Sequence, residues 1–456
     1  MTAPAIVIAA PSSGSGKTTV ATGLMGALRA AGHSVAPFKV GPDFIDPGYH
    51  ALATGRPGRN LDPVLVGEDL VDALYAHGRG GADIAVIEGV MGLFDGRVAD
   101  GVQVPAPGST AHVAALLRVP VVLVVDARGQ SQSIAALLHG FSTYDSGTRL
   151  AGVILNRVGS ARHEQILRAA CDTVGLPVLG AIPRHAELEV PSRHLGLITA
   201  VEHGSAAGAA VAAMTALIAE HVDLQAVTRI AAAATTPVYA WSPDIVGEPV
   251  AGDPVVAVAA GRAFSFSYAE HVELLTAAGA QVVPFDPLTE PLPPDTSALV
   301  LPGGFPEQYL MELSDNSALR EQIRTLAQRG PVHAECAGLT YLMGDLDGHP
   351  MCGVFQGSAR FTPRLTLGYR EAVALGDSAL HAAGTRLAGH EFHRTAVEFS
   401  SEYPPAWAWR MPDGSTRRDG AVIAGVHASY LHTHPAADPQ SVRRFVAHAA
   451  PSKLAG

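Results

Sequence analysis

The chain has 456 residues, 48% of them hydrophobic and 16% charged, which is enough for two or three domains with large cores. Its net charge of −11 argues against nonspecific binding to nucleic acid or to an anionic membrane surface. We find no run of about 20 strongly apolar residues and no basic segment before Ile6, so we expect a cytoplasmic protein without a membrane span. Cys171, Cys336 and Cys352 are too few and too scattered for a disulfide framework or a zinc site.

The first predicted elements are a strand at 5–10, a glycine-rich turn and a helix. The turn reads APSSGSGKTT and ends in Gly14, Gly16, Lys17 and Thr18. This arrangement aims backbone N–H groups and a helix N-terminus at one point, where a phosphate can bind. Lys17 can reach the β- and γ-phosphates, and Thr18 can place its hydroxyl on Mg²⁺. The turn therefore predicts a nucleotide site, although Pro11 replaces the first glycine of the usual pattern.

Apolar strands then alternate with helical stretches, which predicts a doubly wound, mostly parallel sheet. The further strands are expected at 34–40, 83–87, 119–125, 150–155 and 177–182. Between about 224 and 254 the pattern lapses into a segment rich in Ala, Pro and Gly. We expect a first domain over 1–235, a linker over 236–253 and a second domain over 254–456.

Polar residues follow several of these strands at their carboxyl ends, where ligands bind in open parallel sheets. They are Asp43, Asp46, Glu88, Asp95, Asp126 and Asn156. Carboxylates beside a triphosphate usually hold Mg²⁺ directly or through water. Any one of these acids could instead cap a loop, but their clustering at the edge that carries Lys17 favours a site.

The second half predicts strands at 255–260, 281–285, 298–301 and 331–335, helices near 268–278 and 318–329, and shorter antiparallel strands after Cys352. Cys336 lies between a strand and a helix, as at a nucleophile elbow. We expect the helix N-terminus to lower the thiol pKa. The N–H groups of Gly303, Gly304 and Ala337 could form an oxyanion hole. Candidate bases are His427, His432 and His434.

Nine stretches in one order resemble the cobyrinic acid a,c-diamide synthase family over nearly the whole chain. They are SSGSGKTT, KVGPDFIDPGYH, EGVMGLFDG, ILNRVGSARH, GAIPR, LPGGFPE, HAECAGLTYL, GHEFHRT and SYLHTH. The N-terminal half resembles dethiobiotin-synthetase-like phosphate-loop ATPases, which use a shortened glycine loop. The C-terminal half resembles class I glutamine amidotransferase domains.

The resemblance implies two linked reactions, most similar to those of family members that act on hydrogenobyrinic acid in cobalamin biosynthesis. L-glutamine is hydrolysed at Cys336 with His432 as base and acid, and ATP with Mg²⁺ phosphorylates the a and c carboxylates of the corrinoid, which ammonia then converts to amides. The residues assigned to ATP are Gly14, Ser15, Gly16, Lys17, Thr18, Thr19 and Asn156. The residues assigned to the metal are Thr18, Asp46 and Glu88, and those assigned to the corrinoid are Asp43, Asp46 and Asp95.

The sequence departs from the family pattern at His434, where many class I glutaminases have a glutamate two residues after the catalytic histidine. The third member of the triad therefore stays unassigned. Three alternatives remain open: the same reaction on cobyrinic acid, cobyric acid synthase-type amidation, and a nucleotide-switched ATPase of the partitioning type. Ser12, which stands where partitioning ATPases have an extra lysine, argues against the last. A monomer and a homodimer are both open.

Overall fold

The computed structural model describes residues 4–98, 101–145, 147–184, 192–193, 196–197, 199–234 and 239–450. The chain divides into two compact units, Met1–Trp241 and Ser242–Gly456. We call them the N-terminal unit and the C-terminal unit, and each is described by itself.

The N-terminal unit is built on a seven-stranded sheet with the order β3-β2-β4-β1-β5-β6-β7, in which every neighbouring pair is parallel. The strands are β1 (Ala5–Ala9), β2 (Val35–Val40), β3 (Arg59–Leu61), β4 (Ile84–Glu88), β5 (Val121–Asp126), β6 (Leu150–Val158) and β7 (Val178–Pro183). The expected parallel sheet is confirmed. The short edge strand β3 was not predicted, because three residues carry no readable periodicity.

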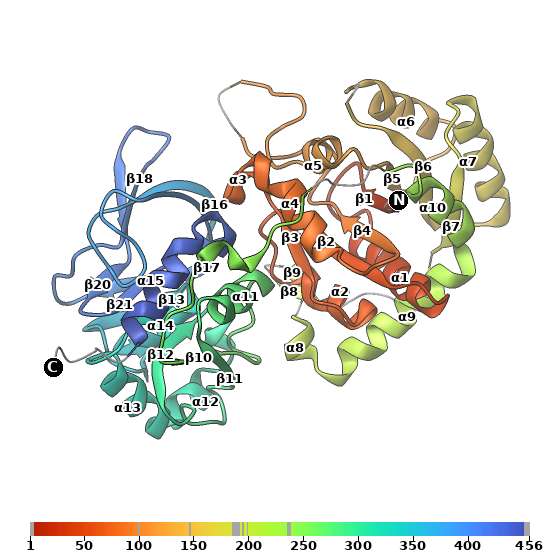
Figure 1. The fold of residues 1–456 in the computed structure, drawn as a ribbon. Coiled ribbons are helices and arrows are strands. Elements are labelled where there is room, and N and C mark those ends of the chain that lie inside the picture. The colour runs from red at the N-terminus through yellow and green to blue at the C-terminus, as the bar shows by residue number, and fades with distance from the viewer. Residues whose placement is uncertain are drawn as a thin grey trace. The chain divides into compact units, whose positions relative to one another are not determined.

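Helices cover the sheet of the N-terminal unit. They are α1 (Lys17–Ala30), α2 (Asp46–Thr54), α3 (Pro63–Val66), α4 (Glu68–Gly78), α5 (Thr110–Leu117), α6 (Ile134–Thr143), α7 (Ala161–Thr173), α8 (Ala200–His203), α9 (Ser205–His221) and α10 (Leu224–Ala231). Helices α1, α2 and α9 pack on one another, and α4 packs on α5; Figure 1 shows these two groups on opposite faces of the sheet.

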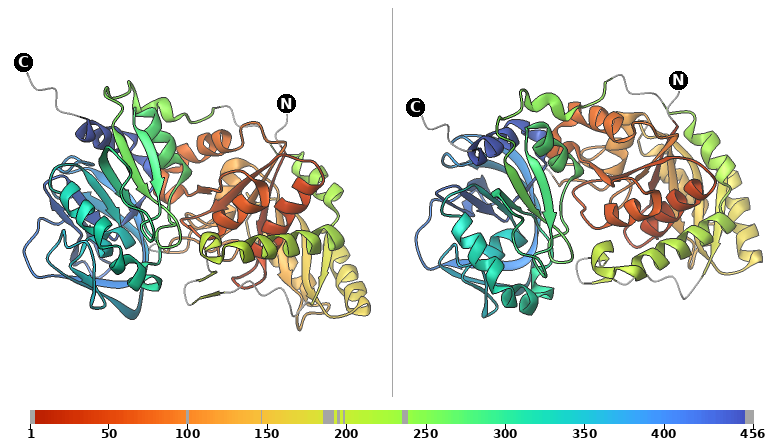
Figure 2. Two further views of the ribbon diagram at one scale, coloured as in Figure 1. Left: turned by 90° about the horizontal axis from the view of Figure 1, so that it is seen from below. Right: turned by 60° about the horizontal axis from the view of Figure 1, so that its bottom comes forward.

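The long helix α9 runs beside α1 in all views (Figures 1 and 2). Two glycines of α1 permit this close packing, because a Cβ on Gly23 would collide with the Met214 carbonyl and one on Gly26 with Thr215. Strands β8 (Ser192–Arg193) and β9 (Gly196–Leu197) form a separate antiparallel pair. Among the described residues, no helix is both long and apolar enough to span a bilayer.

The C-terminal unit has a six-stranded sheet with the order β11-β10-β12-β13-β21-β20, which is parallel except for the β20–β21 pair. Its strands are β10 (Val255–Ala259), β11 (Gln281–Phe285), β12 (Thr296–Leu301), β13 (Val332–Glu335), β20 (Ala421–Ile423) and β21 (Val426–Ser429). The helices are α11 (Ala269–Ala277), α12 (Leu310–Asp315), α13 (Ser317–Leu326), α14 (Ala337–Leu342) and α15 (Pro439–Ala449), with 3-10 turns η1 (Pro243–Val246), η2 (Pro306–Gln308) and η3 (Pro435–Ala437).

A second, mostly antiparallel sheet is formed largely by strands after Cys352, as expected, but its two main strands are long. They are β16 (Gly357–Ala374) and β17 (Arg386–Phe399), of 18 and 14 residues. The smaller strands are β14 (Asp345–Leu346), β15 (His349–Pro350), β18 (Trp407–Arg410), β19 (Thr416–Asp419) and β22 (His432–Thr433). The prediction of short strands was wrong here. The two long strands continue to pair on both sides of a register shift between Phe361 and Thr366.

Candidate active sites in the two units

The glycine loop between β1 and α1 adopts a conformation that requires glycine at two positions. Gly14 has φ +81° and Gly16 has φ +94°, values that side-chain-bearing residues rarely adopt. The amide of Asn156, at the end of β6, donates to the Ser15 carbonyl at 3.0 Å. A Cβ on Gly16 would collide with that amide. Asn156 therefore supports the loop directly, while its assignment to the adenine stays a prediction.

Lys17 and Thr18 open α1, and their side chains contact the end of β4, the loop after it and the start of α2. The Lys17 ammonium is buried and donates to the Met91 carbonyl at 2.5 Å. Burial and the nearby charge of Lys39 lower the pKa of Lys17. The Thr18 hydroxyl lies 2.6 Å from Glu88 Oε1 and 3.3 Å from Asp46 Oδ2. The structure thus brings Thr18, Asp46 and Glu88 together beside the loop.

Lys39, a residue that the sequence reasoning missed, lies at the centre of this cluster. Its ammonium donates to Asp46 Oδ2 at 2.6 Å, to Glu88 Oε1 at 3.0 Å and to the Gly89 carbonyl at 3.1 Å. The opposite oxygen of Glu88 accepts a bond of 2.6 Å from His50 Nε2, and both of these side chains are fully buried. The available signal was a single lysine within the otherwise uncharged strand VAPFKV, next to its carboxyl end.

The acids of this cluster differ in their electrostatics. Burial and the charges of Asp43 and Glu88 raise the pKa of Asp46 well above its usual value. Burial acts the same way on Glu88, but the charge of Lys39 and the bond from His50 outweigh it and hold the pKa of Glu88 below its usual range. Burial alone would lower the pKa of Lys39, yet the two carboxylates reverse the shift. The result is an ionised Lys39–Glu88 pair with Asp46 as the acid that binds a proton more easily.

Three other predicted acids make loop contacts. Asp43 accepts from the Ile45 and Asp46 N–H groups at 2.7 and 3.0 Å, which caps the start of α2. Asp95 accepts from the Gly92 N–H at 3.0 Å. Asp126 pairs with Arg157 at 2.6 Å, and Arg157 also donates to the Gly14 carbonyl at 2.9 Å. Each of these carboxylates therefore shapes a loop around the site, and the assignment of Asp43 and Asp95 to the substrate stays a prediction.

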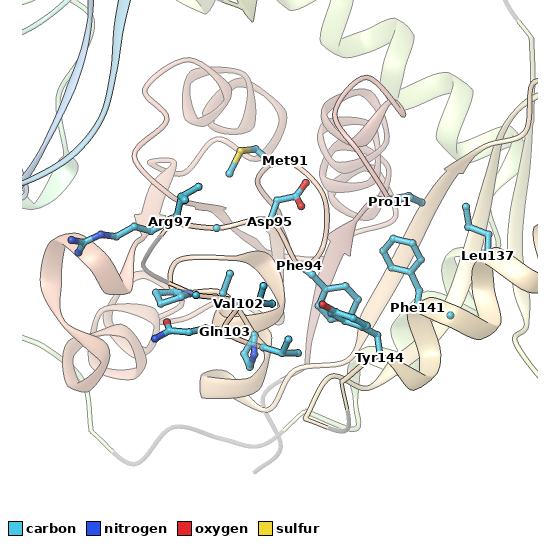
Figure 3. Close-up of a pocket in the computed structure, with 18 of the residues that line it drawn as sticks. Pro11, Met91, Phe94, Asp95, Arg97, Val102, Gln103, Leu137, Phe141 and Tyr144 are labelled. Carbon is cyan, nitrogen blue, oxygen red and sulfur yellow. The ribbon is translucent and has the colours of Figure 1, made fainter. Parts of the chain in front are cut away.

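A cavity of about 860 Å³ lies beside the glycine loop, within the N-terminal unit. Its lining includes Pro11, Met91 and Asp95 on the side of the loop. Figure 3 shows the rings of Phe94, Phe141 and Tyr144 gathered on another side. The Phe94 ring stacks on Phe141 with centroids 5.6 Å apart and approaches Tyr144 to 4.9 Å. The cavity thus combines an aromatic wall with the Asp95 carboxylate and with Met91, whose carbonyl accepts the bond from Lys17.

In the C-terminal unit, Cys336 forms the one-residue turn between β13 and α14. Its φ of 50° and ψ of −97° lie in a sparsely populated region, typical of a strained nucleophile turn. The backbone is held there by the bond from the Cys336 N–H to the Ser429 carbonyl at 2.8 Å. Gly338 gives α14 its close approach to β12, because a Cβ would collide with the Leu301 carbonyl. The expected elbow geometry is present.

The expectation of a lowered thiol pKa at Cys336 was wrong. The side chain is only 4% exposed, and burial together with the charge of Glu307 raises the pKa of the thiol. The Ala337 N–H acts in the opposite direction but is outweighed. Helix α14 is only six residues long, so its N-terminus offers little compensation. Cys336 is therefore a neutral thiol that needs a base to become a nucleophile.

The three candidate histidines differ in their surroundings. His432 is fully buried in β22, and a Cβ on Gly303 would collide with its Cε1 atom. The structure thus brings His432 to the predicted oxyanion glycines. His427 Nδ1 lies 3.1 Å from Ser378 Oγ, and the His427 ring packs on Trp407. His434 accepts the Ala436 N–H at 3.3 Å through Nδ1 and packs on Tyr268.

Comparison with known proteins gives two family-model matches, one in each unit. Residues 6–198 match a model described as CobQ/CobB/MinD/ParA nucleotide binding domain. Residues 255–440 match one described as CobB/CobQ-like glutamine amidotransferase domain. The first model also covers partitioning-type ATPases, so full-length relatives decide between the alternatives.

The chain is 68% identical over 454 residues to the hydrogenobyrinate a,c-diamide synthase of Mycobacterium tuberculosis (strain ATCC 25618 / H37Rv), covering 99% of both chains. The chain belongs to the a,c-diamide synthase family. The Streptomyces coelicolor relative of the same name is 56% identical, with 97% of each chain covered. The cobyrinate a,c-diamide synthase of Gloeobacter violaceus is 44% identical, covering 97% of this chain and 96% of its own. Family membership confirms the resemblance seen in the motifs and the fold class of both units.

Proposed function

We propose that this protein is an ATP- and glutamine-dependent ligase that amidates the a and c carboxylates of hydrogenobyrinic acid in cobalamin biosynthesis. The observation that carries this is the identity of 68% over 99% of the chain to a relative named for that reaction. A nucleotide-binding domain and a glutamine amidotransferase domain in one chain supply the two chemistries that the reaction requires. The carboxylate must be activated because it is a poor electrophile for ammonia at neutral pH.

The activation step belongs to the N-terminal unit. The glycine loop binds the ATP phosphates through its N–H groups, and Lys17 exchanges its bond to the Met91 carbonyl for a γ-phosphate oxygen. A corrinoid carboxylate oxygen attacks the γ-phosphorus, and the bond to the β,γ-bridging oxygen breaks, which leaves ADP and an acyl phosphate. Lys39 stands 2.6–3.0 Å from the acids that border this space, so its charge can stabilise the transferring phosphoryl group.

The residues beside Thr18 fit a magnesium ion. Mg²⁺ is usually held by one or two carboxylates together with substrate phosphates and water, and the Thr18 hydroxyl, Glu88 and Asp46 supply such oxygens. Among the described residues, no group of three or more His, Cys, Asp or Glu side chains is arranged to hold a metal. When bound, the ion would neutralise phosphate charge during transfer.

The corrinoid occupies the cavity beside the glycine loop. Its apolar macrocycle contacts the wall of Phe94, Phe141 and Tyr144, since large rings bind well against aromatic surfaces. The cavity meets Asp95 and Met91 at the end near Lys17, so a peripheral carboxylate can reach the γ-phosphate. Asp43, in the loop before α2, and Asp46, the first residue of α2, approach the same carboxylate.

The ammonia step begins in the C-terminal unit. His432 takes the thiol proton of Cys336, and the sulfur adds to the carboxamide carbon of glutamine. The N–H groups of Gly303, Gly304 and Ala337 bind the oxyanion. His432 returns the proton to the leaving nitrogen, which departs as ammonia and leaves a thioester, and water hydrolyses the thioester to glutamate. Ammonia then attacks the acyl phosphate and displaces inorganic phosphate.

The alternative candidate substrate is cobyrinic acid. The relative from Gloeobacter violaceus is named for that acid and shares 44% identity over 97% of this chain. The same residues would activate either acid. Parallel assays with the two corrinoid acids, followed by chromatography of the amides, decide which is used faster and how many amides form. Two amides support the a,c-diamide reaction, whereas a product with a different set of amides would point to the cobyric acid synthase type.

The central experiment separates the two chemistries by replacing Cys336 with alanine. Cys336→Ala should lose glutamine-dependent amidation but keep amidation driven by ammonium salt at high pH, where free ammonia is abundant. Loss of both activities in a folded variant would show that the two reactions are not separable. Retention of glutamine use would show that Cys336 is not the nucleophile.

A further inference from the structure

A catalytic histidine usually needs a carboxylate to fix its tautomer and to stabilise its protonated form. In this chain His434 stands where that carboxylate is expected, two residues after His432. The structure gives His434 a different role, because its Nδ1 accepts the Ala436 N–H at 3.3 Å and its ring lies 4.3 Å from that of Tyr268. An imidazole that caps the turn η3 is no substitute for a negative charge.

A carboxylate does face His432: it is that of Glu335, the last residue of β13. Glu335 Oε2 lies 3.5 Å from His432 Nδ1, and the side chain of Glu335 is 13% exposed. The other oxygen, Oε1, accepts from both the N–H and the hydroxyl of Thr433 at 3.1 Å each. It also lies 3.4 Å from His333 Nε2. Glu335 is therefore held in place by three groups that leave one oxygen directed at the histidine.

The local fold explains why the residue before the nucleophile can do this. Side chains alternate along a strand, so His333 and Glu335 lie on the same face of β13. At Cys336 the chain leaves the strand with a positive φ, which turns the thiol away from the direction that the strand would continue. Thr433 follows His432 in β22, so its two bonds to Glu335 tie the histidine-bearing strand to the nucleophile-bearing one.

We propose that Glu335 is the positioning carboxylate of the glutaminase site and completes a Cys336–His432–Glu335 triad; this rests on the glutaminase reaction proposed above. Glu335 accepts the Nδ1–H of His432, which leaves Nε2 as the base. A Cβ placed on Gly303 would lie 3.2 Å from that Nε2 atom, so Nε2 is on the side of the predicted oxyanion hole.

The protonation states agree with this arrangement. Burial alone would raise the pKa of Glu335, but the bonds from His333 and His432 hold it well below its usual value, so the carboxylate is ionised. The thiol of Cys336 is neutral, because burial raises its pKa. Transfer of the thiol proton to Nε2 creates an imidazolium next to the Glu335 charge. The proton later moves to the leaving ammonia, and Glu335 itself stays ionised throughout.

The test replaces the carboxylate by its neutral isostere, Glu335→Gln, in the full-length protein. We expect glutamine kcat to fall about 10²-fold or more, as when a histidine loses its orienting carboxylate, with KM for glutamine within about threefold. Ammonia-driven amidation should keep the wild-type rate, because activation belongs to the N-terminal unit. The matched control is His434→Asn, which keeps an acceptor for the Ala436 N–H. Its kcat with glutamine should fall by less than about threefold.

A double-mutant cycle tells a positioning role from a structural one. If Glu335 acts through His432, adding Glu335→Gln to a His432→Ala variant should lower kcat with glutamine only slightly further. The proposal would be overturned if Glu335→Gln lowered kcat with glutamine by about a further 10²-fold in the His432→Ala background. It would also be overturned if Glu335→Gln alone lowered that kcat by less than about threefold. An equal loss in His434→Asn would overturn it as well.

Hydrogen exchange of peptides from the C-terminal unit checks that Glu335→Gln is folded. If it is not, Glu335→Asp decides: we expect it to keep kcat within about tenfold of wild type, and a loss of 10²-fold or more would overturn the proposal. Failure of the proposed function itself would look different. In that case the wild-type protein would not hydrolyse glutamine, or Cys336→Ala would leave hydrolysis intact, whatever the effect of Glu335→Gln.

Discussion

Replacing Lys39 with methionine tests the charge cluster beside the glycine loop. Methionine keeps the length and the apolar stem of lysine but removes the positive charge that contacts both Asp46 and Glu88, at 2.6 and 3.0 Å. These side chains are 10% and 0% exposed, so water cannot replace the ammonium. The variant leaves two carboxylates facing each other in a low-dielectric interior.

Removing one partner of a buried ion pair typically costs about 3–5 kcal/mol, because the other charge stays buried and unpaired. We expect this loss in the free energy of unfolding of the N-terminal unit at pH 7. Without Lys39 the carboxylates should bind protons more readily in the folded state than in the unfolded state. Protonation then favours the folded state as pH falls, so the cost should shrink towards pH 5.

The assay is urea titration followed by hydrogen exchange of peptides covering β2 and β4, at pH 7 and pH 5. Peptide resolution is needed because two units need not unfold in one step. Lys17→Met is a matched control: it also removes a buried ammonium, but that ammonium donates to the neutral Met91 carbonyl, so the loss in the free energy of unfolding should stay under about 1.5 kcal/mol. A cost below about 1 kcal/mol for Lys39→Met at pH 7, or an equal cost at both pH values, would refute the reasoning.

Two further variants address the chemistry of the N-terminal unit. Lys17→Ala should abolish amidation with either glutamine or ammonia, because phosphate charge is no longer neutralised during transfer, and near-normal product formation would remove the proposed ATP site. Phe94→Ala should raise the KM for the corrinoid about tenfold, equivalent to about 1.4 kcal/mol, and leave the KM for ATP unchanged. If instead the KM for ATP rises and that for the corrinoid does not, the cavity binds the nucleotide.

Local patterns in the sequence predicted most of the fold and the proximity of several candidate site residues. The parallel strands were readable as apolar runs, and residues after those runs, such as Glu88, meet at one sheet edge because parallel strands end there together. Lys39 was not predicted as a site residue because it lies within a strand, one residue before its end. At such a position a side chain is expected to belong to the core. The role of Lys39 depends on Asp46 and Glu88, which lie 7 and 49 residues away in the chain.

The C-terminal unit shows the same division between local and nonlocal causes. The elbow at Cys336 follows from adjacent residues and was predicted. The thiol pKa depends on burial and on Glu307, which come from tertiary packing, so an argument from the helix N-terminus alone gave the wrong direction. Glu335 was not considered because the expected carboxylate was sought after His432 in sequence, whereas Glu335 approaches that ring from β13, a strand of the other sheet.

At Cys336 the strained backbone lowers the stability of the fold, while the side chain is needed for the proposed glutaminase activity. A side chain at φ 50° and ψ −97° costs about 1–3 kcal/mol, which glycine would not incur. Glycine at this position should therefore give a more heat-resistant but inactive glutaminase, and alanine an inactive one without that gain. A search for thermostable variants that ignored function would select against the proposed nucleophile, so stabilising changes to this enzyme should be sought away from Cys336.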